Sequence, residues 1–230
     1  KETLNPWNTS HAPGGSSSGS ATAVAAGLCA GSIGSDTGGS IRFPAANNNI
    51  VGLMPTYGRV SRKGVMPLSW TLDHVGPMTR TVEDAALMLH AISGFDPADR
   101  TTSTESVSDF RSALNPDIKG LQIGILEDSL VDIDPDIEEA MERSIKVFEA
   151  LGAQLCPVRI PNYRVLHIAN SIIYLVEAFN NFGTRLREDS SKLGKIFRIY
   201  GYMGGLFSAD EYVQAMRLRS RTRVEVGELF

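Results

Sequence analysis

The feature that most constrains this chain is the segment at residues 11–44, HAPGGSSSGSATAVAAGLCAGSIGSDTGGSIRFP, which holds two clusters rich in glycine and serine. The clusters, GGSSSGS at residues 14–20 and SDTGGS at residues 35–40, flank an alanine-rich stretch at residues 21–30 that we expect to form a helix. Glycine permits positive φ and exposes backbone N–H groups, while serine supplies a donor, an acceptor and a latent nucleophile. The pattern predicts that tight turns and hydroxyls are brought together at one point.

A flexible linker is the alternative interpretation, because runs of glycine and serine are typical of linkers. The flanking sequence argues against it. The first cluster runs into the helix-forming residues 21–30, where Val24 and Leu28 share one helix face at a spacing of four. The second cluster is followed by apolar residues at 41–44 and 50–53 that are typical of a core. Since linkers do not lie between packed elements, the linker interpretation is disfavoured.

Five segments carry a more specific signal, and they occur in this order: NPWN at 5–8, PGGSSSGS at 13–20, GSDTGGSIRFPA at 34–45, GLMPTYGRVS at 52–61 and LDHVGPMTRTVEDA at 72–85. Together they resemble the signature of the amidase signature family, serine hydrolases that cleave carbon–nitrogen amide bonds. The resemblance covers about residues 5–103. It implies an α/β fold with a mixed, largely parallel sheet covered by helices on both faces.

The resemblance also assigns catalytic roles. It implies that Ser40, which closes the DTGGS motif, is the nucleophile, and that Ser16, 24 positions earlier, relays its proton to an uncharged lysine. The Gly15–Ser16 peptide bond would then be cis, and Gly14, Gly15 and Ser17 would support the segment. An activated serine needs such a base, because a free hydroxyl is a weak nucleophile. One of the serines at 16–18 is also expected to cap the following helix.

Negative charge that develops on the substrate oxygen needs donors that are already in place. Because glycine allows the main chain to curl, we expect an oxyanion hole formed by the backbone N–H groups of Thr37, Gly38, Gly39 and Ser40. Asp36 and Arg42 flank this loop, and we expect them to form an ion pair that supports the turn and takes no part in the chemistry.

The lysines depart from the family pattern. The family's catalytic lysine lies well upstream of the serines, whereas Lys1 is only 15 residues before Ser16 and sits in a loop-like context. The remaining lysines are expected to be solvated charges: Lys63, Lys119, Lys146, Lys192 and Lys195. We therefore expect a single partial amidase domain, with a signature core at 1–115 and a strand–helix–strand unit plus a helical region at 116–230. Its lysine-bearing N-terminal part and its C-terminal part are expected to be missing, so that the chain alone is inactive.

Composition argues against a nucleic-acid-binding protein and against a membrane-spanning one. With 230 residues, 42% of them hydrophobic, the chain is long enough for a substantial core. A net charge of −4 gives no electrostatic case for binding nucleic acid, and no apolar run of 18 residues suggests a membrane span. Cys29 and Cys156 are expected to be reduced core residues, and the cytoplasm is the expected location.

Downstream, the pattern alternates between strands and helices. We expect helices at 81–93, 134–151, 160–189 and 208–230, strands at 120–126 and 153–158, and a surface loop at 96–112. The strand–helix–strand passage implies parallel pairing. An apolar helix face is expected to pack on the core and, as in similar enzymes, to help shape the acyl pocket: Ile172, Ile173, Leu175, Val176, Phe179 and Phe182.

Other catalytic schemes are poorly supported. A Ser-His-Asp triad would need one of four histidines near Ser40, and no GxSxG motif is present; the histidines are His11, His74, His90 and His167. No HxH, HExxH or CxxC motif suggests a metal, and no cofactor is required.

The resemblance thus leads to an amidase that acts on a small-molecule amide through an acyl-enzyme on Ser40, with a homodimer as one assembly that it allows. Two alternatives stay open. One is the amidase subunit of a glutamine-dependent tRNA amidotransferase, which associates with partner subunits. The other is a non-catalytic scaffold or pseudoenzyme.

Overall fold

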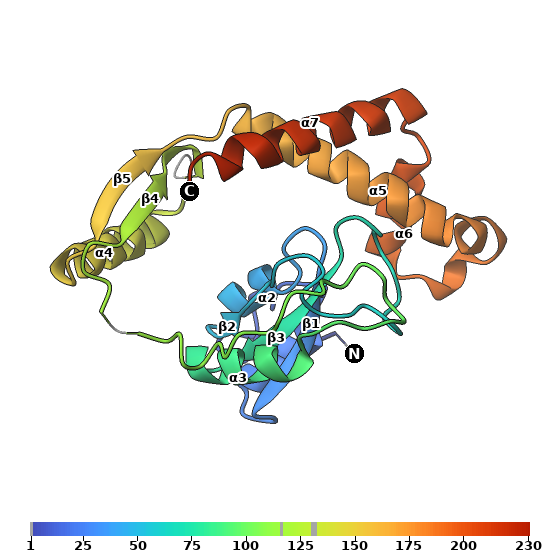
Figure 1. Ribbon diagram of the computed structural model, residues 1–230. Coiled ribbons are helices and arrows are strands. Elements are labelled where there is room, and N and C mark those ends of the chain that lie inside the picture. Colours follow the sequence, from blue (N-terminus) through green and yellow to red (C-terminus); the bar gives the residue numbers. More distant parts are fainter. Residues whose placement is uncertain (1, 116, 130–132) are drawn as a thin grey trace. The chain divides into compact units, whose positions relative to one another are not determined.

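The computed structural model describes residues 2–115, 117–129 and 133–230, and the chain divides into two compact units (Figure 1). One unit combines Lys1–Leu114 with Tyr174–Phe207, and the other combines Asn115–Ile173 with Ser208–Phe230. Lys1, which the sequence places in a loop-like context, lies outside the described residues. The single partial domain stays a prediction.

The first unit contains a small sheet with helices around it. Its elements are α1 (Ser18–Ala25), β1 (Gly31–Asp36), α2 (Arg42–Asn47), β2 (Val51–Gly52), β3 (His74–Thr79), α3 (Val82–Ile92), the part of α5 (Tyr163–Glu188) from Tyr174 onward, the 3-10 helix η2 (Ser190–Lys192) and α6 (Lys195–Gly204). The mixed α/β class predicted from the sequence is confirmed.

The three strands of this unit are ordered β1-β3-β2, and β3 pairs antiparallel with both neighbours. β1 and β2 therefore run in the same direction, with α2 between them in sequence as a crossover. Residues 53–73, which contain no helix, lead into β3, and β3 enters the sheet in the opposite direction. These three strands therefore do not show the largely parallel pairing that was predicted. Among the described residues, parallel pairing occurs only in the second unit.

The alanine-rich helix is shorter and begins earlier than the sequence suggests. α1 ends at Ala25 because Gly27 adopts a φ of 72°, and the N–H groups of Gly27 and Leu28 donate back to carbonyls of Val24 and Ala23 at 3.1 and 2.9 Å. This is a Schellman ending, in which glycine stops a helix that alanine would continue. Leu28 consequently lies outside the helix and is 79% exposed, so the expected Val24–Leu28 face does not form.

Two hydrophobic clusters hold the first unit together. One packs α1, α2 and β3 around the fully buried Ile41, through Ala21, Ala45 and Met78. Burying an aliphatic side chain of this size is worth about 1.5–3 kcal/mol. Because Ile41 directly follows Ser40, this packing fixes one end of the expected nucleophile loop. The second cluster joins α3 to β3: Val60, Val75 and Leu89, with Leu53, Ile92 and Phe110 against them.

The expected helix at 81–93 is confirmed as α3. Its N-cap Thr81 accepts a hydrogen bond from the Asp84 N–H at 3.1 Å, and Gly94 follows its end with a φ of 139°. Residues 96–112 contain no helix or strand, as expected of a loop.

The second unit contains the predicted strand–helix–strand passage. Its elements are β4 (Gln122–Leu126), the 3-10 helix η1 (Glu127–Ser129), α4 (Pro135–Ala150), β5 (Gln154–Val158), the first part of α5 and α7 (Ala209–Gly227). β4 and β5 pair in parallel, as predicted. Asp134 caps α4 before its N-terminal proline, and Ser208 and Glu211 form the capping box of α7.

The cysteines differ in part from the prediction. Both are free thiols. Cys29 is half-buried, but Cys156 on β5 is exposed. In β5, Leu155 and Val158 are partly buried, whereas Cys156 and its neighbour Pro157 are exposed.

Candidate functional site

The nucleophile loop, defined here as residues 36–41, connects β1 to α2 and is organised by one buried carboxylate. The side chain of Asp36 is fully buried, and it accepts hydrogen bonds from the N–H groups of Gly39 at 2.7 Å and Ile41 at 3.1 Å. The Nε and Nη2 atoms of Arg42 each lie 3.0 Å from one of its oxygens. The predicted Asp36–Arg42 pair is present, and Asp36 joins the start of the loop to its end.

The ionisation of this pair follows from its contacts. Burial by itself would raise the pKa of Asp36, but the hydrogen bonds from Arg42, Gly39 and Ile41, together with the Arg42 charge, outweigh burial and lower it. The hydrogen bond to Asp36 raises the pKa of Arg42 in turn. Asp36 is therefore an ionised anchor for backbone donors.

The expected oxyanion donors fall into two groups. The N–H group of Gly39, whose φ is 121°, donates to Asp36. The N–H groups of Thr37, Gly38 and Ser40 donate to no other residue in the described ranges. This differs from the expectation for Gly39, since the carboxylate that holds the loop already occupies its proton. Three donors rather than four are open to a ligand.

The segment with Ser16 is joined to this loop through Ser17. The Ser17 N–H donates to the Ser40 carbonyl oxygen at 3.3 Å, and its Oγ lies 3.2 Å from both the carbonyl oxygen and the N–H nitrogen of Ser35. Ser17 is the N-cap residue of α1, but its side chain makes no capping bond because β1 engages it. The support role predicted for Ser17 has a physical basis in these contacts.

The backbone around Ser16 has the predicted form. The Gly15–Ser16 peptide bond is cis, which confirms that expectation. Gly14 has a φ of 75°, and a Cβ atom there would lie 2.7 Å from the Cα of Pro44. Only glycine fits this approach to the start of α2. Glycine therefore brings the first cluster against the residues that follow the second one.

The two hydroxyls themselves are unengaged in this state. Ser16 is exposed and Ser40 is half-buried, and neither side chain forms a hydrogen bond with another described residue, each other included. Catalytic hydrogen bonds often shorten only when substrate is bound. The structure thus brings the two serine segments together through Ser17.

A second carboxylate, which sequence reasoning did not single out, holds the other side of the loop. Asp73 accepts a hydrogen bond from the Thr37 hydroxyl at 2.6 Å. Its second oxygen accepts the N–H groups of Leu68 at 2.8 Å and Ser69 at 3.0 Å. The available signal was its place in the LDHVG segment, directly before β3, whose first residue His74 pairs with Asp36.

The structure also describes His74 and the lysines other than Lys1, which were considered as catalytic groups from the sequence. Every described lysine is exposed, as predicted for solvated charges: Lys63, Lys119, Lys146, Lys192 and Lys195. The ring of His74 packs edge-on against Tyr57 with its Nδ1 atom 2.5 Å from the Leu72 carbonyl oxygen. Within the described ranges, no group of three His, Cys, Asp or Glu side chains could hold a metal ion, and none of the helices has the length and apolar character needed to span a membrane.

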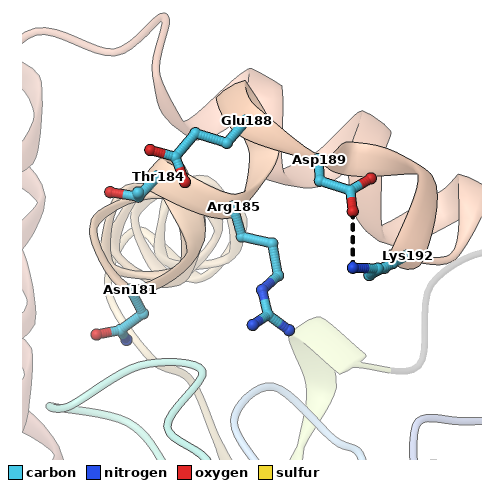
Figure 2. A pocket seen from close by; sticks show the side chains of 6 residues that line it. All are labelled: Asn181, Thr184, Arg185, Glu188, Asp189 and Lys192. Atoms are coloured by element: carbon cyan, nitrogen blue, oxygen red, sulfur yellow. Dashed lines mark ion pairs between the residues drawn. The ribbon is translucent and has the colours of Figure 1, made fainter.

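Helix α5 borders two open pockets in the first unit. A polar one of about 400 Å³ is formed by α5 and η2, where Lys192 pairs with Asp189 at 3.0 Å (Figure 2). The other, about 340 Å³, includes Val176 and Phe179 from the predicted apolar face. Ile173 and Leu175 of that face are buried, whereas its role in shaping an acyl pocket stays a prediction.

Comparison with known proteins finds relatives of this chain. The sequence profile of the family described as Amidase matches residues 1–221. The A subunit of the glutamyl-tRNA(Gln) amidotransferase of Trichlorobacter lovleyi is 38% identical over 99% of this chain and 52% of its own length.

Two solved structures extend the comparison. One is a chain of a vestigial protein complex described as revealing the evolutionary origins of an s-triazine catabolic enzyme. It matches with a TM-score of 0.92 and 34% identity, over 99% of this chain and 49% of the length of that chain. The peptide amidase PAM, in complex with chymostatin, matches with a TM-score of 0.82 and 34% identity over 96% and 50%. This chain spans about half the length of each of these three proteins.

Proposed function

The chain belongs to the amidase family, and on that premise we propose that it carries the nucleophilic centre of an enzyme that hydrolyses carbon–nitrogen amide bonds. The supporting observation is the nucleophile loop: Asp36 holds a turn whose Thr37, Gly38 and Ser40 N–H groups are free among the described residues. Such preorganised donors stabilise the oxyanion that forms when a hydroxyl attacks a carbonyl.

The proposed reaction proceeds through an ester on Ser40. The Ser40 Oγ atom attacks the amide carbonyl carbon while its proton passes to the Ser16 hydroxyl, which gives its own proton to an uncharged amine. That amine, an upstream lysine in the resemblance, is none of the exposed lysines described above. The tetrahedral intermediate collapses, the carbon–nitrogen bond breaks, and the leaving nitrogen takes up the proton. Water then attacks the ester by the same route and releases the carboxylate.

The experiment is ammonia release from acetamide, benzamide and glutamine by the full-length protein. We expect Ser40→Ala to abolish release and Ser16→Ala to lower kcat by about 10²–10⁴-fold, the range for a lost proton-transfer group. Lys63→Ala is the control and should retain full activity. Full activity of Ser40→Ala would remove the proposal.

A second candidate function is the amidase component of a tRNA-dependent amidotransferase, which the name of the Trichlorobacter lovleyi relative favours. In that case the substrate is glutamine, the ammonia passes to a partner protein, and hydrolysis depends on that partner and on charged tRNA. The peptide amidase similarity favours a free-standing amidase instead. Measuring glutamine hydrolysis with and without charged tRNA and the partner proteins separates the two.

The remaining alternative is a non-catalytic scaffold, in which no amide is cleaved although the loop is intact. If none of the three amides is hydrolysed and a fluorophosphonate does not label Ser40, the scaffold interpretation is favoured. We further propose a cytoplasmic location, supported by the two free cysteines, since disulfides are rare in that compartment.

A further inference from the structure

We propose that Glu177 on α5, with Asn181 one turn later, is a positioning residue that sets the nucleophile loop through Asp73 and Thr37. This inference rests on the proposed function and deepens it. The loop that transmits the effect, here called the bridging loop, is residues 68–73, between β2 and β3.

Glu177 is buried and is bound to the bridging loop by three hydrogen bonds. Its Oε2 atom accepts the Ser69 hydroxyl at 2.5 Å and the Thr71 N–H at 3.0 Å, and its Oε1 atom accepts the Thr71 hydroxyl at 2.8 Å. A buried carboxylate is costly unless it is satisfied in this way. The contacts with this loop therefore stabilise the buried Glu177 carboxylate.

Asn181 holds the same loop at its other side. Its amide nitrogen donates to the Leu68 carbonyl oxygen at 3.0 Å, and its amide oxygen accepts the Trp70 indole N–H at 2.9 Å. The Asn181 side chain extends from α5 in Figure 2. Two residues at a spacing of four thus lie on one helix face and clamp the bridging loop.

The clamp connects to the nucleophile loop through a shared residue. Ser69, which is fully buried, donates its hydroxyl to Glu177 and its N–H to Asp73. Asp73 in turn accepts the Thr37 hydroxyl at 2.6 Å. The path Glu177–Ser69–Asp73–Thr37 consists entirely of hydrogen bonds between buried or half-buried groups, where such bonds are strong and directional.

This path gives the nucleophile loop a second anchor. Asp36 fixes Gly39 and Ile41 at the far end of the loop, whereas among the described residues the Thr37 side chain is bound by Asp73 alone. An oxyanion donor must lie about 2.7–3.1 Å from the developing charge. A small shift of the Thr37 end of the loop therefore weakens the hydrogen bond that its N–H group donates in the transition state. Loss of Glu177 should therefore lower kcat more than it raises KM.

The test is a double-mutant cycle in the full-length protein, with ammonia release as the assay. We expect Glu177→Ala and Thr37→Val each to lower kcat about 10-fold or more while KM changes less than about twofold, since misplaced groups can cost up to about 100-fold. Because both substitutions act on one path, the kcat of the double variant should lie within about threefold of that of the slower single variant. If the two losses in kcat multiply in the double variant, the proposal is wrong.

Two further variants separate positioning from folding. Glu177→Gln preserves the shape and can still accept from Ser69 and the Thr71 N–H while donating to the Thr71 hydroxyl, so it should retain kcat within about threefold. Glu188→Ala removes an exposed carboxylate from the same helix and should leave kcat and KM unchanged (Figure 2). If Glu177→Gln loses activity as fully as Glu177→Ala, the proposed geometry is wrong.

A readout independent of activity keeps the inference separate from the proposed function. In amide hydrogen exchange, Glu177→Ala, or Thr37→Val if the first variant does not fold, should speed exchange at Gly39 and Ile41, whose N–H groups bind Asp36. Faster exchange confined to residues 68–73 would overturn the inference. A wild-type protein that hydrolyses no amide would remove the proposed function but leave this test intact.

Discussion

The two oxygens of Asp36 face the Nε and Nη2 atoms of Arg42 at 3.0 Å each, with the Asp36 side chain fully buried and the Arg42 side chain 53% exposed. The arginine neutralises a charge that would otherwise be isolated in the core, and the carboxylate remains available to the Gly39 and Ile41 N–H groups. A fork that binds both oxygens also fixes the plane of the carboxylate. The nucleophile loop therefore depends on this ion pair.

Replacing the carboxylate should damage both stability and catalysis. We expect Asp36→Asn to lower the free energy of unfolding by about 1.5–3 kcal/mol, the value of hydrogen bonds to a charged group, and to lower kcat by about 10–100-fold. Denaturant unfolding and ammonia release measure the two effects. Glu139→Gln, which breaks the exposed ion pair with Arg143, is the control and should change stability by less than about 1 kcal/mol. Equal losses from both variants would contradict this account.

The pH dependence of stability follows from the lowered pKa of Asp36. A group whose folded pKa lies below its unfolded value, about 3.9 for aspartate, stabilises fully above that value and loses its contribution as pH falls through the folded pKa. The difference in unfolding free energy between wild type and Asp36→Asn should thus be constant at neutral pH and shrink below about pH 4. Denaturation at pH 7 and pH 3 tests this, and a difference that grows toward pH 3 would have the wrong sign.

Two glycines of nearly equal φ offer a matched comparison. Gly14 has a φ of 75° with Pro44 in the way of a Cβ atom, whereas Gly27 has a φ of 72° with open space around it. Gly27→Ala should cost only the backbone strain, about 1–2 kcal/mol, and should retain activity. Gly14→Ala should cost more and lower kcat, because the added Cβ atom would push the segment that carries Ser16 away from Pro44. Thermal unfolding and kinetics compare them; similar kcat values for both variants would refute the role of Gly14.

Ser17 and Ser20 form a second matched pair, because both donate side-chain hydrogen bonds to carbonyl oxygens of β1, Ser35 at 3.2 Å and Ile33 at 2.9 Å. Each substitution to alanine should cost about 0.5–1.5 kcal/mol in unfolding free energy. Only Ser17→Ala should lower kcat, by about 10-fold with KM unchanged, because the Ser17 side chain holds in place the backbone N–H that binds the Ser40 carbonyl oxygen. A kcat loss shared by both variants would show general weakening of β1.

The features that the sequence predicted well are local in the chain. The predicted starts of the helices at 81, 134 and 208 agree with the structure to within one residue. Each is capped by a side chain that accepts a backbone N–H two or three residues away, so the signal lies within one short window. The Asp36–Arg42 pair also spans only six positions. The cis bond at Ser16 came from the family resemblance, because no local propensity predicts it.

The features that were missed depend on distant partners or on competition between signals. Ser69 and Glu177 are 108 residues apart, and neither stretch alone shows that the other satisfies it. The antiparallel direction of β3 appears only in its pairing with β1 and β2, because strand periodicity says nothing about direction. At the end of α1, Gly27 overrides the helix preference of the neighbouring alanines.

The central claim is that Ser40 is the nucleophile, and fluorophosphonate labelling of the full-length protein tests it most directly. A protease that cleaves before aspartate cuts at Asp36 and Asp73, so Ser40 falls in peptide 36–72 while Ser16 stays in the preceding one. Fragmentation of the labelled peptide by mass spectrometry then locates the adduct. We predict an adduct on Ser40 that Ser40→Ala abolishes; an adduct on Ser16, or labelling that persists in Ser40→Ala, would contradict the account.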